Sequence, residues 1–391
     1  MKSPAPVASA GLPVASHGAA PRVQALDGLR GLAILAVLFH HLFVFEPAGR
    51  WGAVIASMAE FAAHGVDLFF ALSGYLIIRQ LSTGISRRGF LAEFWVKRFA
   101  KIAPIYLLAV SGAFLGLKYA FAWTGSLGKL PWLASGAGNW TWYLLFGSNL
   151  LNAINGHFTN PALDVAWSLG IEVQFYILAV VAAMLVPRVR WPSLAWGAIV
   201  IAFLFRAGML EHGANWVQVL VLTPGRLDAF AFGGLVALLP NLFARWPAWP
   251  VGALLLLPGF VGWSRTRPVC ELFGYSAVAV ASAILIDRAT RPATPDRLRK
   301  ALECRPLRLM GQISYSVYLT HLPLRAAMRD WFLGADRTLT HPSDWAAQLV
   351  FTLGAGVICV AVGWSVWRLV EEPVRSSIVN FYRGSRLPGT G

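Results

Sequence analysis

Long apolar segments follow one another along almost the whole of this 391-residue chain. Hydrophobic residues make up 57% of it and charged residues 13%, about half the charged share of a soluble domain. Segments of about 17–25 apolar residues are typical of helices that cross a bilayer. The pattern therefore predicts an all-α polytopic membrane protein with about ten transmembrane helices. We place these helices at about 29–46, 61–80, 103–121, 165–186, 194–210, 226–240, 250–263, 270–287, 307–324 and 346–370.

The regions outside these segments are short. The stretch WTWYLLFGSNLL at 140–151 is too short to span and predicts a re-entrant or interfacial piece. No internal repeat and no second domain is visible, so we expect one membrane domain over 26–375. Two cytoplasmic tails, 1–25 and 376–391, would flank it. The first tail is rich in Ala, Pro and Ser and lacks the apolar core of a signal peptide, so we expect it to be disordered.

The basic residues predict the orientation of the chain in the membrane. With a cytoplasmic N-terminus, the inside segments carry 22 of the 33 Lys and Arg residues. This bias is typical of cytoplasmic loops and predicts a multi-pass membrane protein with a cytoplasmic N-terminus. The net charge of +15 could suggest nucleic acid, but the basic residues lie in short clusters between apolar segments. Three cysteines without close, even spacing indicate neither a disulfide framework nor a metal site.

The first apolar segment contains two ionisable residues on one face. Eleven residues separate Arg30 from His41, which is three helical turns plus about 20°, or roughly 16 Å along the axis. Ionisable groups inside a span are costly and are therefore candidates for function. His40 points about 80° away from that face, so the spacing favours His41. The alternative is an Arg that snorkels to the membrane surface and a His that only packs.

The predicted orientation places other polar residues at the inner or the outer side of the membrane. Glu172 would lie at a depth similar to that of His41, where a carboxylate and an imidazole can pair, although Glu172 could also serve packing. Arg98 and Lys101 share a helix face at the inner side. They could hold the phosphates of a soluble cofactor or anionic lipid headgroups, and charge alone favours lipid. An acceptor pocket could be lined by Asp67, Tyr318 and His321, or these residues could serve structure.

Six ordered motifs and a terminal VEEPVR together resemble the membrane-bound acyltransferase-3 family over about 26–375. The motifs are LDGLRG…FHH, GVDLFFALSGYLI, KRFAKIAPIY, WSLGIEVQFY, TPGRLDAFAFGGL and ISYSVYLTHLPL. The resemblance implies a bacterial O-acyltransferase of the inner membrane that takes an acyl group, most often acetyl, from cytoplasmic acyl-CoA. The acceptor would be a hydroxyl of a cell-surface glycan, glycolipid or similar molecule, and membrane lipid would surround the protein.

The resemblance also implies roles for the residues singled out above. The family's Arg–His pair matches Arg30 and His41, and its motif glutamate matches Glu172. His41 would be the base for the acceptor hydroxyl, and Glu172 would orient it, as the acid does in a Ser-His-Asp triad. The family's basic pair matches Arg98 and Lys101, which with Arg30 would face the anionic end of coenzyme A.

This chain departs from the family pattern in three ways. Val173 replaces a second acidic residue that often follows the glutamate, and Lys101 replaces an Arg, so a bidentate phosphate contact becomes a point charge. The chain ends about 20 residues after VEEPVR, which predicts a stand-alone form without the soluble esterase-like domain of many relatives. Such a form would complete the transfer itself or hand over to a separate periplasmic transferase.

Two other function classes fit parts of the pattern. A transporter or flippase for a lipid-linked sugar or small anion would also place polar residues in spans at two depths. The missing repeats and the predicted pairing of His41 with Glu172 speak against it. A purely structural scaffold would have no reason to bury Arg30, His41 and Glu172 in apolar segments. Release of free coenzyme A from acetyl-CoA would separate the enzyme from the transporter.

Overall fold

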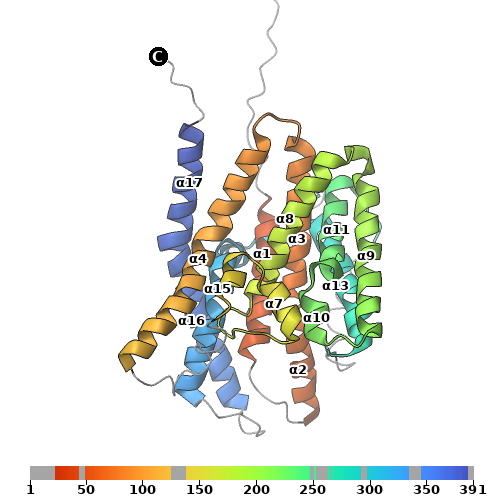
Figure 1. The fold of residues 1–391 in the computed structure, drawn as a ribbon. Helices are drawn as coiled ribbons and strands as arrows, with labels where there is room; N and C mark the ends of the chain where they lie inside the picture. The colour runs from red at the N-terminus through yellow and green to blue at the C-terminus, as the bar shows by residue number, and fades with distance from the viewer. Residues whose placement is uncertain are drawn as a thin grey trace, which may run out of the picture.

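A computed structural model describes residues 23–43, 49–124, 138–246, 251, 263–264, 266–291, 297–333 and 345–385. Within these ranges the secondary structure is helical, with no β-strand. Most of the long helices run roughly along one direction and pack side by side (Figure 1). The predicted all-α class is therefore confirmed. The predicted N-terminal tail lies almost entirely outside the described residues.

Seven helical segments in the described part of the chain are long and apolar enough to cross a membrane, so this is a multi-pass membrane protein. Two further predicted spans, 226–240 and 307–324, correspond to helices that are not among the seven, and 250–263 lies almost wholly outside the described residues. The count of about ten and the cytoplasmic N-terminus stay predictions. The seven segments are Gln24–Leu42, Gly49–Gly84, Phe90–Leu115, Ala166–Leu185, Arg188–Glu211, Cys270–Thr290 and Ala346–Gly384.

Seven of the described helices (α1, α3, α8, α9, α11, α13 and α16) lie within about five residues of predicted spans, and α4 and α15 extend beyond theirs. The bounds are α1 Gln24–Leu42, α2 Gly49–Ala62, α3 Gly65–Gly84, α4 Phe90–Thr124, α6 Trp140–Leu144, α7 Ser148–Asn155, α8 Ala166–Leu185, α9 Trp191–Glu211, α10 Trp216–Val221, α11 Leu227–Leu238, α13 Tyr275–Thr290, α14 Arg297–Leu302, α15 Arg305–Leu333, α16 Trp345–Val366 and α17 Glu372–Gly384. Short 3₁₀ turns, Arg188–Arg190 and Thr223–Arg226, precede α9 and α11, and π-helical turns, Cys270–Gly274 and Trp367–Glu371, precede α13 and α17.

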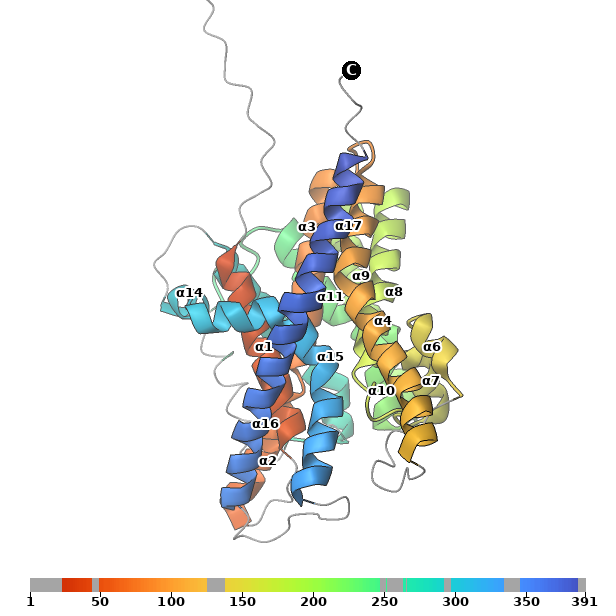
Figure 2. The same ribbon diagram turned by 90° about the vertical axis from the view of Figure 1, so that its left-hand side faces the viewer.

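Two of these segments differ from their predicted forms. The stretch predicted as one re-entrant or interfacial piece consists of α6 and α7, which lie at the edge of the bundle beside α10 (Figure 2). The chain turns sharply between them at Phe146, whose φ is 55°. At the C-terminal end, helix continues through a π-helical turn into α17, so it ends at Gly384 rather than near 370.

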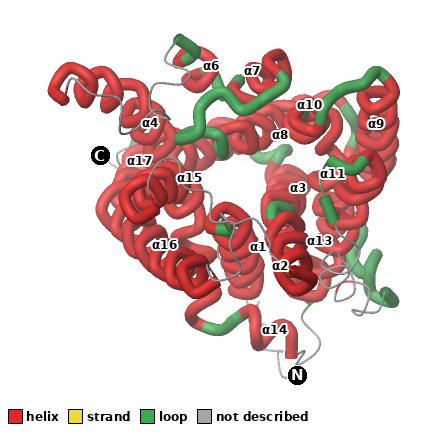
Figure 3. The backbone as a smooth tube through the Cα atoms, turned by 90° about the horizontal axis from the view of Figure 1, so that it is seen from below, coloured by secondary structure: helices red, strands yellow, loops and turns green. Residues whose placement is uncertain are grey.

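Helix α1 lies among α2, α3, α15 and α16 when the molecule is viewed along the bundle (Figure 3). Its most extensive contact is with α15, and glycines make this contact close. A Cβ atom at Gly31 of α1 would overlap the carbonyl group of Leu307 in α15, and one at Gly311 of α15 would overlap that of Asp27 in α1. Small residues that let two backbones touch are typical of helix pairs in membranes. The α1–α15 contact thus fixes the relative positions of the side chains farther along both helices.

Helix α3 packs against α11 in the same way. A Cβ atom at Gly74 would overlap the carbonyl group of Phe230, and one at Gly233 would overlap that of Ala71. Each helix therefore contributes a glycine against the partner's backbone. Glycines thus line two close contacts, one between α1 and α15 and one between α3 and α11. Because α3 also contacts α1, the four helices form one packed group.

We expect Gly311→Ala to destabilise the protein because the added methyl group must displace the backbone of α1. Overpacking of this kind costs about 1–3 kcal/mol. A methyl group at Gly208 in α9 would meet no heavy atom of another described element within 4 Å. Gly208→Ala is therefore a matched control that should leave stability unchanged or slightly higher. Thermal unfolding in detergent measures both. Equal melting temperatures would contradict the close α1–α15 contact.

Candidate active site

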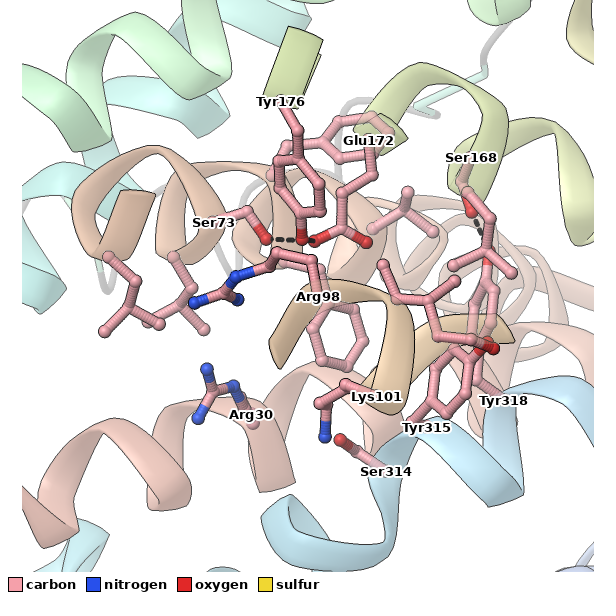
Figure 4. A pocket seen from close by; sticks show the side chains of 17 residues that line it. Arg30, Ser73, Arg98, Lys101, Ser168, Glu172, Tyr176, Ser314, Tyr315 and Tyr318 are labelled. Atoms are coloured by element: carbon pink, nitrogen blue, oxygen red, sulfur yellow. Dashed lines mark hydrogen bonds between the residues drawn. The ribbon is translucent and has the colours of Figure 1, made fainter. Parts of the chain in front are cut away.

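Two of the cavities among the described residues are lined by predicted site residues, and one of these two contains the predicted cations. We call it the Arg98 cavity; α1, α3, α4, α8 and α15 surround it (Figure 4). Its volume is about 100 Å³. It is lined by Arg30, Val66, Phe69, Phe70, Leu72, Ser73, Leu76, Arg98, Lys101, Ile102, Ser168, Leu169, Glu172, Tyr176, Ser314, Tyr315 and Tyr318.

Arg98 is held in this cavity by neutral groups. Its guanidinium group donates a hydrogen bond to the side-chain oxygen of Gln80 at 2.8 Å. The same group lies 5.6 Å from the ring centre of Phe94 and 5.7 Å from that of Tyr176. Within the described part of the chain, no carboxylate forms an ion pair with Arg98. Its positive charge is therefore available to an anionic ligand.

The other two predicted cations line the same cavity, and each has a carboxylate partner. Arg30 lies 3.3 Å from Asp27, one helical turn earlier in α1. The Lys101 ammonium group lies 3.5 Å from the buried Glu371 carboxylate. Arg30, Arg98 and Lys101 all face one space, as Figure 4 shows. The structure thus brings together the three residues that the sequence predicted for the donor.

Glu172 lies in the Arg98 cavity and does not pair with His41. Its carboxylate accepts hydrogen bonds from the hydroxyl groups of Ser73 and Tyr176 (Figure 4). The predicted His41–Glu172 pair is therefore not formed among the described residues. Both residues were predicted at a similar depth, but depth does not determine which cavity a side chain enters. Glu172 projects from α8 toward α3, whereas His41 lies at the far end of α1.

His41 lines a second cavity, the His41 cavity, whose volume of about 220 Å³ is twice that of the first. Its walls come from α1, α3, α15, α13 and the segment that precedes α8. The two cavities share Val66 and Tyr318 in their walls. The lining residues are His40, His41, Ala63, His64, Val66, Asp67, Phe158, Pro161, Asp164, Val165, Trp167, Leu220, Arg226, Tyr275, Tyr318, Leu322 and Arg325.

Asp67, a predicted acceptor-binding residue, joins two other ionisable groups in this wall. One carboxylate oxygen lies 2.7 Å from Nδ1 of His64, and the other pairs with the guanidinium group of Arg226. The carbon at the centre of that guanidinium lies 3.7 Å from the ring centre of Tyr275. His64, Asp67 and Arg226 are all at least 95% buried. Charges in such a place are stable only when they are paired, and these are.

Tyr318 lines both cavities. Its hydroxyl group is 2.6 Å from that of Ser168 and 3.3 Å from the carbonyl oxygen of Val165. His321, one turn later in α15, does not line the His41 cavity. It is fully buried, and its Nε2 lies 3.1 Å from Nδ1 of His41. Of the three predicted acceptor-binding residues, Asp67 and Tyr318 line the cavity and His321 lies behind His41.

The arrangement combines a cation-lined cavity with a histidine-lined one, and comparison with known proteins assigns the family. A family model with the description "Acyltransferase domain", that of the acyltransferase-3 family, matches residues 23–368. The chain belongs to the acyltransferase-3 family. The resemblance inferred from the sequence motifs is thereby confirmed.

Relatives within the acyltransferase-3 family differ in length. Peptidoglycan O-acetyltransferase OatA of Listeria monocytogenes is 26% identical over 396 residues, which cover 93% of this chain and 57% of that protein. A Staphylococcus aureus protein named provisionally as an O-acetyltransferase is 25% identical over 343 residues, 80% of this chain and 52% of its own length. This chain thus spans little more than half the length of these two. Acyltransferase MdmB of Streptomyces mycarofaciens is 26% identical over 381 residues, 90% and 91% of the two chains. No solved structure matches significantly.

Several residues that line the cavities of this acyltransferase-3 protein had no role predicted from the sequence. Arg226 belongs to the motif TPGRLDAFAFGGL, and an Arg at the start of an apolar segment was a signal for it. Ser73 carried no signal of a role in a site, whereas Tyr176 lies four residues after Glu172, a spacing at which two side chains on one helix can bond. Asp164 and Arg325 lie 161 residues apart in the sequence, and only the fold brings them to one cavity.

We expect the buried carboxyl group of Asp164 to make the stability of the protein depend on pH. It precedes α8 outside the membrane-spanning segment, and burial raises the pKa of its carboxyl group from 3.8 to about 7. The folded state therefore holds the proton more tightly than the unfolded state, and the free energy of unfolding falls as the pH rises from about 4 to 7. We expect Asp164→Asn to raise the melting temperature by a few degrees at pH 8 and to leave it unchanged near pH 4. An equal gain at both pH values would contradict this cause.

Proposed function

We propose that this protein transfers an acyl group, most simply acetyl, from acyl-CoA to a hydroxyl group of a glycan or glycolipid. The Arg98 cavity takes the donor and the His41 cavity takes the acceptor. One observation carries the proposal: two cavities of different chemistry are adjacent, with Val66 and Tyr318 in the walls of both. Transfer needs such an arrangement, because donor and acceptor must reach the same point from separate sites. Family membership and the names of the relatives support the choice of reaction.

The cations support acyl-CoA as the donor. Coenzyme A carries several negative charges at neutral pH, and Arg is well suited to phosphate because its planar group donates two parallel hydrogen bonds. Arg98 offers this group without a carboxylate competitor in the described residues. Arg30 and Lys101 add positive charge at the same cavity. The donor would enter from the Arg30 end of α1, which we place at the cytoplasmic face of a bacterial inner membrane.

The His41 cavity supports an acceptor rich in hydroxyl groups. It offers carboxylate, guanidinium and imidazole groups that can donate or accept hydrogen bonds, with aromatic side chains beside them. Sugars present hydroxyl groups around an apolar ring face, so both kinds of side chain have a partner. The Listeria relative is named for peptidoglycan, which contains such sugars. A glycan-type acceptor therefore agrees with both the lining and the family.

The chemistry requires two things of the protein, a base and hydrogen-bond donors for the oxyanion. A thioester is already activated, so transfer needs removal of the acceptor proton and stabilisation of the tetrahedral oxyanion. His41, with an imidazole suited to proton transfer near neutral pH, would be the base. Glu172 lies among the donor-side groups, so the task of orienting His41 falls to another residue. Its place beside Arg98 suits a role on the donor side.

We expect Arg98→Ala to weaken acyl-CoA binding by roughly 1.5–3 kcal/mol, the scale of one charged hydrogen bond. Lys97, on the same helix, is 42% exposed and paired with Glu93, so Lys97→Ala is a control that should bind acyl-CoA normally. Calorimetric titration of acetyl-CoA into the purified variants measures the difference. Equal affinities for Arg98→Ala and wild type would show that this cavity does not hold the donor.

We expect His41→Ala to abolish acyl transfer and His40→Ala to retain most of it. His40 is close to His41, but its Nδ1 bonds to the carbonyl oxygen of Ala59 at 2.9 Å, which ties α1 to α2. The assay is release of free coenzyme A thiol from acetyl-CoA by purified protein with a peptidoglycan fragment or other oligosaccharide. A wild-type protein that binds the sugar but never releases the thiol would favour a transporter instead. Loss of activity in His40→Ala alone would move the base to His40.

A further inference from the structure

The contact between His41 and His321 determines which nitrogen of each ring carries hydrogen. Nδ1 of His321 lies 2.8 Å from the carbonyl oxygen of Tyr318 and 3.2 Å from that of Val317. A carbonyl oxygen can only accept a hydrogen bond, so this nitrogen carries the hydrogen. In the neutral ring, Nε2 of His321 is then an acceptor, and it is this atom that faces His41.

The same reasoning applies to His41. Its Nδ1 lies 3.1 Å from the carbonyl oxygen of Val37 and 3.1 Å from Nε2 of His321. Both partners are acceptors, so Nδ1 of His41 carries a hydrogen that the two share. The neutral His41 ring then has its lone pair on Nε2. Two N–H groups could not face each other at this distance, so this assignment is the one that satisfies both rings.

We propose that His321 is the positioning residue for His41, a role that rests on the proposed acyl transfer. His321 fixes the tautomer and the direction of the His41 ring, as a carboxylate does in a Ser-His-Asp triad. Here the partner is a neutral imidazole, held by two backbone carbonyl groups and fully buried. This assignment replaces the substrate-binding role that the sequence suggested for His321.

In the proposed transfer step, His41 moves the proton and His321 stabilises the charged form of His41. Nε2 of His41 takes the proton of the acceptor hydroxyl while the acceptor oxygen forms a bond to the thioester carbonyl carbon. The tetrahedral intermediate then collapses, the carbon–sulfur bond breaks, and the proton on His41 passes to the sulfur of coenzyme A. While His41 carries the extra proton, its Nδ1–H donates to the lone pair of His321, which stabilises the charged ring. His321 itself exchanges no proton with substrate.

The close α1–α15 contact fixes the distance between the His41 and His321 rings. His41 lies near the end of α1 and His321 lies in α15, and the rings have centres 4.9 Å apart. Gly31 of α1 and Gly311 of α15 lie in this helix contact and leave no room for the helices to slide without overlap. The distance between the rings is thus set by backbone contact rather than by the two side chains.

Two substitutions separate positioning from packing. In His321→Gln, the side-chain amide oxygen can occupy the place of Nε2 and accept from His41, whereas His321→Phe fills similar volume without an acceptor. We expect kcat to fall on the order of 10²-fold or more in His321→Phe, since a comparable loss of a tautomer-fixing partner costs about 10⁴-fold. His321→Gln should retain at least about ten times the kcat of His321→Phe. KM for acetyl-CoA and for the acceptor should change little in either variant.

The outcomes distinguish the possible failures. A raised acceptor KM with unchanged kcat would overturn the proposal and return His321 to substrate binding. Equal losses in the Gln and Phe variants would show a packing role only. Nitrogen NMR of histidine-labelled wild type tests the tautomer without turnover: a neutral His41 protonated at Nε2 would overturn the proposal even in an inactive protein. Wild type that never releases coenzyme A would overturn the proposed function, whatever the spectrum shows.

Discussion

The backbone contact between α1 and α15 is the constraint on which the rest of this structure depends. In a bilayer, apolar side chains gain little by leaving lipid for protein, so helices associate through close van der Waals packing. Gly31 and Gly311 permit that packing where any larger residue would collide with a carbonyl group of the other helix. Arg30 and His41 project from one of these helices and Tyr318 and His321 from the other. Their geometry therefore follows from the position of two backbones.

Buried charges impose a second constraint around the cavities. Arg206 and Asp228 form a fully buried pair at 2.9 Å, and Ser276 bonds to both. Arg226, at the end of the 3₁₀ turn that precedes α11, pairs with Asp67 across to α3. Unpaired charges would be very costly at such depth, so these contacts hold α3, α9, α11 and α13 in one arrangement. Arg98 differs because its described partners are neutral, which is the property expected of a residue that binds an anion.

The sequence predicted most of the long helices but only part of the site, because spacing along one helix does not determine how helices face each other. Apolar segments of bilayer length and the helical period fix where helices lie and which residues share a face of one helix. They placed Arg98 and Lys101 on one helix face, and the family resemblance added Arg30, which lines the same cavity. They failed for Glu172, because two residues at similar depth on different helices face each other only if the helices are rotated toward one another. That rotation is set by packing, which no spacing within one segment encodes.

What the sequence by itself determined is therefore the class of protein, most helices, the family and the residues that carry charge within apolar segments. Only the tertiary structure decided that Glu172 bonds to Ser73 and Tyr176, while His41 meets His321. Ser73 and Glu172 lie 99 residues apart in the sequence, and the two histidines lie 280 residues apart. Contacts over such separations arise when helices pack, and packing depends on small differences in shape, such as a glycine facing a carbonyl group, that are distributed over many segments of the chain.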